Sequence, residues 1–270
     1  MLELDKARGF VLDMDGVLYR GDEPLPGLVE FVETSDRRGI PFVFVTNNSM
    51  RTPAQYVAKL ADLGVTVPAN RIITSGVSVV EYLREHYPRG TRLYIIGMPA
   101  LHELLLADET GYVFDAAAPE LVVCGSDLTL TYEKLKIATL AIRRGAAWVA
   151  TNPDTTLPVE DGLWPGAGAI LAALRATTGA EPIIVGKPEP VMMQQALRRM
   201  GVPPAEAVMV GDRLDTDILG GIRAGMTTVL VMTGVETPAT IAAQASIHPD
   251  YILRDLAELV ERAYGVAVAR

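Results

Sequence analysis

Two aspartates, Asp13 and Asp15, close an apolar run at residues 9–14 and stand two positions apart. Alternate residues of an extended chain point to the same side, so both carboxylates are expected to face one site. Gly16 follows them and lets the backbone turn sharply without a Cβ clash. The chemistry available there is that of a nucleophile or of oxygen ligands for a cation. The alternative is an acidic pair that merely starts a solvated turn.

A second polar segment, Thr46-Asn47-Asn48-Ser49, follows the apolar run at residues 42–45. A hydroxyl and successive backbone N–H groups at a strand end can form a nest for anionic oxygens. The same residue types are also good N-caps, here for a helix expected to begin near Thr52. Taken alone, the capping interpretation would be the better one.

A third segment places Lys187 between Gly186 and Pro188, directly after an apolar run. An ATP-binding P-loop is excluded, because that motif needs a glycine six residues before the lysine and Ser or Thr after it. Glu181 and Pro188 occupy those positions. A solvated lysine is the alternative, although its position after a strand argues against it.

A fourth segment, residues 209–217, carries Asp212, Asp215 and Asp217 after another apolar run. Mg²⁺ is usually held by one or two carboxylates together with water and substrate phosphate, and Asp212 with Asp13 would serve. We expect at least one of Asp215 and Thr216 to cap the helix that follows.

The elements that position these segments follow from short apolar runs alternating with stretches of helical period, a pattern typical of an α/β protein with a mainly parallel sheet. We predict strands at residues 9–14, 42–45, 72–74, 93–96, 121–124, 148–150, 183–185, 207–210, 228–232 and 251–253. We predict helices at residues 26–38, 52–63, 77–85, 99–107, 132–143, 166–177, 190–200, 216–224 and 256–262, with a loop at 151–165. Ligand sites of such sheets lie beyond the carboxyl ends of the strands. The four segments are therefore expected to converge on one edge, where they supply a nucleophile, phosphate donors and a divalent-cation site.

Composition narrows the classes of function. The 270 residues are 49% hydrophobic and 21% charged, as in a globular protein with a sizeable core. Acidic residues outnumber basic ones 33 to 24, which gives a net charge of -9. A nucleic-acid binder usually presents a basic face, so nucleic acids and anionic membrane surfaces are not expected partners. A small anionic substrate remains compatible, since a local positive cluster can oppose the global charge.

Other features give weaker indications. Cys124 is the single cysteine and lies in an apolar run, so a buried packing role is expected rather than a disulfide. The first residues contain no apolar signal-peptide core, and we expect a cytoplasmic protein without a spanning helix. Gly166-Ala167-Gly168 lacks the third glycine and the preceding strand of a dinucleotide fingerprint and is interpreted as a helix start.

The four segments, in this order, resemble the motifs of the haloacid dehalogenase-like (HAD) phosphatase superfamily. The stretches DMDGVLY (13–19), TNNS (46–49), GKP (186–188) and GDRLDTDI (211–218) are most similar to subfamily IIA, the NagD and p-nitrophenyl-phosphatase-like group. TYEKL (131–135), TNPD (151–154) and TGV (233–235) are also similar to that group. The resemblance extends over nearly the whole chain.

Spacing indicates where an extra domain would lie. Only 30 residues separate Asp15 from Thr46, but 137 separate Ser49 from Lys187. We therefore expect a Rossmann-like parallel-sheet core at residues 1–77 and 181–270. An inserted α/β cap would occupy residues 78–180, and the resemblance implies that this cap is of type II.

The resemblance implies a role for each core residue. Asp13 would attack phosphorus and form an aspartyl phosphate, and Asp15 would protonate the leaving oxygen and then activate water. Mg²⁺ would be held by Asp13, the Asp15 carbonyl and Asp212. Lys187, together with Mg²⁺, would offset the repulsion between Asp13 and the phosphate and stabilise the transition state. Thr46, Asn47 and Asn48 would bind phosphate, and Asp217 would orient Lys187 or metal-bound water. A dehalogenase of this fold has no need of the acid at Asp15, which therefore favours phosphoryl chemistry.

Substrate choice would depend on the cap. The loop that contains Asn152 and Asp154 is a candidate for contacts with the leaving group, and a simple Asn-Pro-Asp turn is an equally good interpretation. The expected activity is Mg²⁺-dependent hydrolysis of a small phosphomonoester such as a sugar phosphate, a nucleoside monophosphate or p-nitrophenyl phosphate. A phosphotransferase or mutase is one alternative, and a non-catalytic module like a response-regulator receiver is another, although such modules are about half this length. Caps of this type often pair in relatives, which suggests a homodimer.

Overall fold

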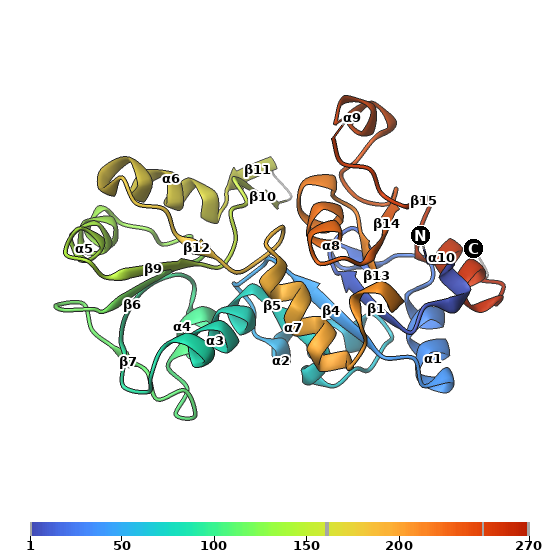
Figure 1. Ribbon diagram of the computed structural model, residues 1–270, viewed down its shortest axis with the longest axis horizontal. Helices are drawn as coiled ribbons and strands as arrows, with labels where there is room; N and C mark the ends of the chain where they lie inside the picture. Colours follow the sequence, from blue (N-terminus) through green and yellow to red (C-terminus); the bar gives the residue numbers. More distant parts are fainter. Residues whose placement is uncertain (1, 160–161, 245, 269–270) are drawn as a thin grey trace. The chain divides into compact units, whose positions relative to one another are not determined.

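The chain folds into two compact units in the computed structural model, which describes residues 2–159, 162–244 and 246–268. The first unit contains Met1–Thr46, Pro53–Ile73 and Lys187–Arg270. The second contains Asn47–Thr52 and Thr74–Gly186. Both are built from a parallel sheet and helices, so the α/β fold class predicted from the sequence is confirmed (Figure 1).

The first unit has a six-stranded sheet in the order β15-β14-β13-β1-β4-β5. Every neighbouring pair from β15 to β4 is parallel. The strands are β1 (Gly9–Asp13), β4 (Phe42–Thr46), β5 (Ile72–Thr74), β13 (Ala207–Gly211), β14 (Thr227–Val231) and β15 (Tyr251–Leu253). The helices are α1 (Leu28–Arg38), α2 (Pro53–Asp62), α7 (Pro190–Met200), α8 (Leu219–Arg223), α9 (Pro238–Ala243) and α10 (Leu256–Tyr264).

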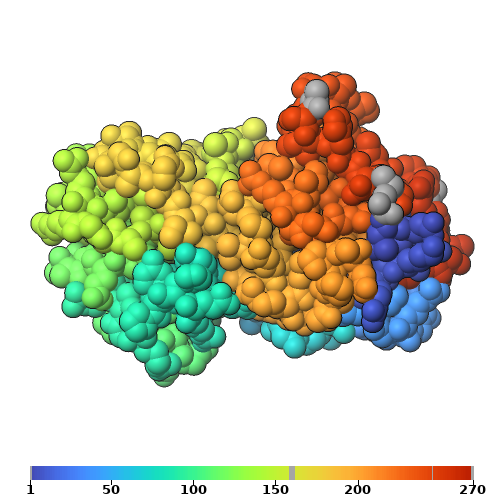
Figure 2. All heavy atoms as spheres, viewed as in Figure 1, coloured from blue at the N-terminus to red at the C-terminus, as the bar shows by residue number. Residues whose placement is uncertain are grey.

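The core of the first unit joins the two ends of the chain. On α1, Leu28, Phe31 and Val32 are buried with helical spacing and pack under β1 and β4. Phe31 and Tyr264 stack with their ring centroids 6.1 Å apart, so α1 meets α10 across about 230 residues of sequence. In Figure 2 the N-terminal segment, in blue, lies beside the C-terminal segment, in red. This unit is therefore discontinuous in sequence.

The second unit has a five-stranded parallel sheet in the order β12-β9-β8-β6-β7. The strands are β6 (Arg92–Ile96), β7 (Val113–Phe114), β8 (Leu121–Cys124), β9 (Ala147–Ala150) and β12 (Ile183–Ile184). The helices are α3 (Ser75–His86), α4 (Pro99–Leu105), α5 (Tyr132–Arg143) and α6 (Ala167–Thr178). Helices α5 and α6 cover one face of the sheet, and α3 and α4 lie on the other (Figure 1).

Cys124 has the packing role predicted for it. Its thiol is fully buried among the residues under α5 and α6 and accepts a hydrogen bond from Trp148 Nε1 at 3.3 Å. Burial raises the pKa of the thiol to about 12, so it stays protonated at neutral pH.

Several elements differ from the sequence predictions, and β7 and α9 were not predicted at all. The loop predicted at residues 151–165 contains an antiparallel pair of strands, β10 (Thr156–Val159) and β11 (Gly162–Pro165). Residues 160–161 of this predicted loop lie outside the described residues. The sequence did not predict this pair, because turn-forming residues and Pro165 indicated a loop. Proline is nevertheless tolerated on edge strands such as these. A small pair, β2 (Tyr19–Arg20) and β3 (Glu23–Pro24), follows β1. The helix predicted at 216–224 begins two residues earlier, as the π-helical turn η4 (Leu214–Ile218).

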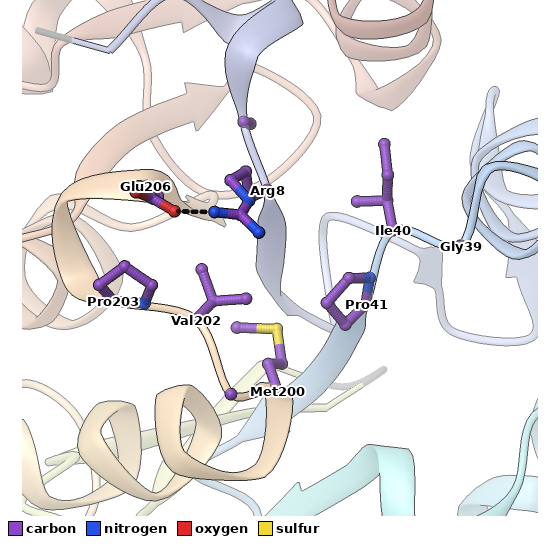
Figure 3. A pocket seen from close by; sticks show the side chains of 10 residues that line it. Arg8, Gly39, Ile40, Pro41, Met200, Val202, Pro203 and Glu206 are labelled. Carbon is purple, nitrogen blue, oxygen red and sulfur yellow. Dashed lines mark hydrogen bonds and ion pairs between the residues drawn. The ribbon is translucent and has the colours of Figure 1, made fainter.

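A cavity of about 290 Å³ opens at the amino ends of the strands of the first unit (Figure 3). Its lining includes the ion pair of Arg8 and Glu206, whose closest N and O atoms are 3.0 Å apart, together with Pro41 and Met200. The residues expected to do chemistry follow the carboxyl ends of the same strands, so this cavity is not their site. Among the described residues, no helix combines the length and the apolar character needed to cross a membrane.

Candidate active site

Strand register brings three of the predicted site residues to one edge of the first sheet. Leu12 lies opposite Phe44 on β4 and opposite Val210 on β13. Asp13, Thr46 and Asp212 come one or two residues later on these strands, at their carboxyl ends. All three residues are buried, with at most 7% of their surface exposed. This is the edge at which ligands bind in open α/β sheets.

Lys187 joins two of the carboxylates. Its Nζ donates to Asp13 Oδ1 in a very short contact and to Asp217 Oδ1 at 2.6 Å. The lysine side chain is only 3% exposed, so the interpretation as a solvated lysine is wrong. A buried ammonium needs such partners, because an unpaired charge away from water is very costly.

Asp212 sits in a cradle formed by glycines. Its Oδ2 accepts a hydrogen bond from the backbone N–H of Val235 at 3.0 Å. A Cβ on Gly234 would lie 1.8 Å from this oxygen, and one on Gly16 would lie 2.6 Å from it. Gly16 also has φ +81°, a backbone conformation that favours glycine. Both positions therefore require glycine for the Asp212 carboxylate to occupy its place.

Asp217 is held by the π-helical turn η4. The backbone N–H groups of Asp217 and Ile218 both donate to the Arg213 carbonyl at 3.1 Å. The Asp217 Oδ2 in turn accepts from the N–H groups of Asp212 and Arg213 at 3.2 and 3.1 Å. With Oδ1 bound to Lys187, this carboxylate orients both the lysine and the backbone beside Asp212. Turns of this kind are frequent at functional sites.

The expectation that Asp215 or Thr216 caps the following helix is wrong. The turn begins at Leu214, and the residue in the N-cap position, Arg213, makes no side-chain capping bond. Asp215 is exposed and pairs instead with the Arg213 guanidinium at 3.0 Å. The early start arises because the turn is organised around Asp217 rather than around a capping side chain.

The electrostatics of this cluster are those of a site with excess negative charge. Burial, reinforced by the neighbouring carboxylates, raises the pKa of Asp13 well above its usual value, and Lys187 opposes this shift. Burial and Asp217 raise the pKa of Asp212 to about 7. Burial alone would lower the pKa of Lys187, but Asp13 and Asp217 outweigh it and raise that pKa.

The donor set fits a hard divalent cation. Carboxylate oxygens of Asp13, Asp212 and Asp217 all lie within 4.8 Å of one another and are buried. With all groups ionised, three carboxylates and one ammonium leave a net charge of −2, which a divalent cation would neutralise. Oxygen-only ligands are those that Mg²⁺ prefers.

Asp15 is placed differently from the other acids. Its side chain is exposed, and the Tyr19 hydroxyl donates to Asp15 Oδ2 at 3.5 Å. The Gly16 N–H donates to the Tyr19 carbonyl at 2.8 Å, which closes a tight turn directly after β1. The Asp15 carboxylate is thus exposed to solvent, whereas Asp13 lies in the buried cluster.

The remaining predicted residues belong to the second unit and gather around Asn47. The Asn47 Nδ2 donates to both carboxylate oxygens of Asp154, at 3.2 and 3.1 Å. The Asn47 carbonyl accepts from Asn152 Nδ2 at 2.7 Å. Asn48 Oδ1 accepts from the Met50 N–H at 2.8 Å and so closes a local turn.

Sequence reasoning missed three residues that support these groups. Ser75 donates from Oγ to the Asn47 carbonyl at 2.6 Å. Its position after the predicted strand 72–74 is the same signal that singled out Thr46 and Asp212. Gly234 and Val235 were noted only as part of a similar stretch, and their contact with Asp212 has no local sequence signal.

Comparison with known proteins agrees with this geometry. A family model described as haloacid dehalogenase-like hydrolase matches residues 10–111, and a second, described as HAD-hydrolase-like, matches residues 184–259. An acid sugar phosphatase of Staphylococcus aureus is 39% identical over 94% of this chain and 96% of its own.

Solved structures of similar proteins extend the match to the whole fold. A 4-nitrophenylphosphatase from Thermotoga maritima aligns with a TM-score of 0.91 at 41% identity, over 96% of this chain and 98% of its own. NagD from Escherichia coli K-12 aligns with a TM-score of 0.84 at 32% identity, over 93% of this chain and 98% of its own. The chain belongs to the haloacid dehalogenase-like hydrolases, within subfamily IIA, and is a phosphomonoester hydrolase of the HAD type.

Proposed function

We propose that this enzyme is a Mg²⁺-dependent phosphatase that hydrolyses small phosphomonoesters through an aspartyl phosphate at Asp13. The observation that carries the proposal is the buried cluster in which Lys187 bridges Asp13 and Asp217 beside Asp212. This cluster pairs a nucleophile with fixed positive charge at the carboxyl edge of the sheet.

The first half of the reaction transfers the phosphoryl group to the protein. An Asp13 carboxylate oxygen forms a bond to phosphorus as the bond from phosphorus to the leaving oxygen breaks. Asp15 donates its proton to that leaving oxygen, so the product departs as a neutral hydroxyl. The Lys187 ammonium and the Thr46 hydroxyl, with the Asn47 N–H, hold the phosphoryl oxygens and stabilise their charge.

The second half returns the enzyme to its starting state. Asp15, now ionised, takes a proton from a water molecule whose oxygen attacks phosphorus. The bond between phosphorus and Asp13 breaks, inorganic phosphate leaves, and Asp15 is again protonated. Asp217 takes no proton in this scheme, because both of its oxygens are engaged with Lys187 and the backbone of residues 212–213.

The metal site is assigned to the carboxylates of Asp13 and Asp212 and the carbonyl of Asp15. Mg²⁺ bound there supplies positive charge that offsets the repulsion between Asp13 and a phosphate dianion. The net negative charge of the cluster and the raised pKa values of Asp13 and Asp212 support this assignment.

The second unit is proposed to be the cap that selects the leaving group, as predicted for residues 78–180. Sugar phosphates, nucleoside monophosphates and p-nitrophenyl phosphate are the proposed substrates. The names of two relatives, an acid sugar phosphatase and a 4-nitrophenylphosphatase, support the first and third classes.

The test is release of phosphate from a panel of these compounds, with Mg²⁺ or with EDTA. We expect turnover that needs Mg²⁺ and that falls by at least about 10³-fold in Asp13→Asn. Asp215→Asn is the matched control, because this exposed acid lies in the same motif as Asp212 but pairs only with Arg213 among the contacts observed. Equal rates in wild type and Asp13→Asn would refute the proposed nucleophile. Diversion of phosphate to an added sugar would identify a phosphotransferase instead.

A further inference from the structure

The chain crosses between its two units four times, and the first and last crossings lie beside two residues of the proposed phosphate site. Thr46 is the last residue of the first unit before one crossing, and Asn47 is the first residue beyond it. Lys187 is the first residue after the last crossing, and Gly186 precedes it. Consecutive Cα atoms are held about 3.8 Å apart by the rigid peptide unit. Whatever fixes Asn47 and Gly186 therefore also restricts where Thr46 and Lys187 can lie.

Asn47 is fixed by three side chains of the second unit. Its carbonyl accepts from Ser75 Oγ at 2.6 Å and from Asn152 Nδ2 at 2.7 Å. Its side-chain amide donates to both oxygens of Asp154. Asn47 and Asn152 are at most 8% exposed, and Ser75 is fully buried. Hydrogen bonds in such surroundings are costly to lose, because the partner left behind has no water to replace them.

Asn152 has both amide hydrogens committed within the protein. Besides the bond to Asn47, its Nδ2 donates to Thr151 Oγ1 at 3.1 Å. Its Oδ1 accepts from the Asp154 N–H at 3.1 Å, which shapes the Asn-Pro-Asp turn that presents the Asp154 carboxylate to Asn47. These contacts describe a residue that organises a loop rather than one that reaches for a ligand.

Glycines allow the backbone segments around Asn47, the Asn152–Asp154 turn and Gly186 to pack closely. A Cβ on Gly186 would lie 2.3 Å from the Thr151 carbonyl oxygen and 2.6 Å from Asn47 Oδ1. A Cβ on Gly168 would lie 2.3 Å from the Pro153 carbonyl oxygen. The Gly168 N–H donates to the Asp154 carbonyl at 2.8 Å. The Gly166-Ala167-Gly168 sequence, which is no nucleotide fingerprint, is thus the support on which the Asn152–Asp154 turn rests.

We infer that Asn47, Ser75, Asn152, Asp154 and Gly186 form a crossing clamp that positions Thr46 and Lys187 for the phosphoryl group. The inference rests on the proposed phosphatase function and assigns to Asn152 and Asp154 a role other than contact with the leaving group. A residue that positions Thr46 and Lys187 affects binding of the phosphoryl group, which all of the substrates share. Its loss must therefore reduce turnover by the same factor whatever the leaving group, and must weaken binding of phosphate itself.

The test compares Asn152→Ala and Ser75→Ala with wild type on p-nitrophenyl phosphate, a sugar phosphate and a nucleoside monophosphate. Displacing a catalytic group by about 1 Å can cost about 100-fold in rate. We expect kcat/KM to fall about 10- to 100-fold for Asn152→Ala, and less for Ser75→Ala, which leaves one donor on the Asn47 carbonyl. The factor should agree across the three substrates. The inhibition constant of inorganic phosphate, which has no leaving group, should rise in parallel.

Thr110→Ala is the matched control for the removal of a hydroxyl. Thr110 is buried in the second unit, and its hydroxyl donates to the Leu105 and Ala107 carbonyls, far along the chain from the crossings. We expect this variant to melt at a lower temperature without a change in phosphate inhibition. If Asn152→Ala does not fold, Ser75→Ala still has to show the uniform loss.

A loss that varies with the leaving group, with phosphate inhibition unchanged, would overturn the clamp and return Asn152 to substrate contact. That result is distinct from failure of the proposed function, which would appear as wild type without turnover on any substrate. In that case calorimetric titration with inorganic phosphate still decides, because equal affinities in wild type and both variants would refute the clamp.

Discussion

The proposed catalytic cluster around Lys187 and the crossing clamp around Asn47 are both buried and polar, yet their groups are matched in opposite ways. In the cluster, three carboxylates share one ammonium, and burial shifts the pKa values of Asp13 and Asp212 upward. In the clamp, the amide of Asn152 and the hydroxyl of Ser75 each meet an acceptor. Polar groups with only a structural role satisfy one another's hydrogen bonds, whereas the cluster proposed to receive a cation and phosphate is left with uncompensated charge.

The largest effect is expected when the Lys187 ammonium is removed from the cluster, because this tests directly whether the cluster carries uncompensated charge. In Lys187→Met the carboxylates of Asp13 and Asp217 lose their counter-charge while remaining buried. Loss of one partner of a buried pair costs about 3–5 kcal/mol of unfolding free energy. We expect a destabilisation of that size in urea melts with EDTA near neutral pH, together with loss of turnover.

The same variant should recover part of its stability in acid, because protonated carboxyls no longer repel one another. Arg254→Met supplies the comparison for a surface cation, since Arg254 is mostly exposed and pairs with Glu258 on α10. A destabilisation of Lys187→Met no greater than that of Arg254→Met would show that the cluster is not electrostatically strained.

Filling the glycine cradle tests the cation site without removing a charge. In Gly234→Ala the new Cβ would overlap Asp212 Oδ2, so this carboxylate must move. Changes that disturb the orientation of a metal ligand typically cost about 10- to 100-fold in affinity or activity. We expect the Mg²⁺ concentration for half-maximal turnover to rise by that factor. Gly220→Ala on α8 is the control, since its Cβ would meet nothing closer than 3.5 Å.

The sequence predicted the cluster better than the clamp, for a physical reason. Asp13 and Thr46 end buried strands and Asp212 follows one, all in the same sheet, and parallel strands bring their carboxyl ends together whatever the details of the loops. Lys187 was expected at this edge because a strand precedes it, but that strand, β12, belongs to the sheet of the second unit, so this reason was wrong for the lysine. The strands at 72–74, 121–124 and 251–253 were predicted with the observed bounds, because apolar runs flanked by polar turns carry a strong local signal.

The clamp depends on pairings that leave no local signal. Asn47 meets Asp154 across 107 positions of sequence, and Asn-Pro-Asp is equally good as an ordinary turn. The π-helical turn at Leu214–Ile218 was likewise missed, because its cause is the set of hydrogen bonds made by Asp217 and not a capping residue. Such features depend on tertiary contacts that a single sequence does not contain.

Proton binding offers a gentler test of the cluster. In the metal-free protein Asp212 holds its proton to about pH 7, whereas in the unfolded chain it loses the proton near its ordinary pKa of 3.8. The folded state therefore binds more protons between these values, so stability contributed by this group falls as pH rises through that window and is constant above it.

Mg²⁺ must displace the Asp212 proton below about pH 7, so its stabilising effect should grow with pH. We expect the rise in melting temperature on adding Mg²⁺ to be larger at about pH 8 than at about pH 5. A shift of equal size at the two pH values would contradict the assignment of Asp212 to the cation site.

The smallest expected effect is a difference in stability between variants of two serines close to the first crossing. Ser75 Oγ donates to the Asn47 carbonyl, whereas Ser49 Oγ is buried with no hydrogen-bond partner among the described residues. A hydrogen bond contributes about 1 kcal/mol to stability, so Ser75→Ala should cost about that much. Ser49→Ala removes only an unsatisfied hydroxyl and should leave the free energy of unfolding unchanged or raise it. Urea melts of the two variants measure the difference directly. An equal loss in both variants would mean that the Ser49 hydroxyl makes a hydrogen bond in solution, and the contrast between the two serines would then not hold.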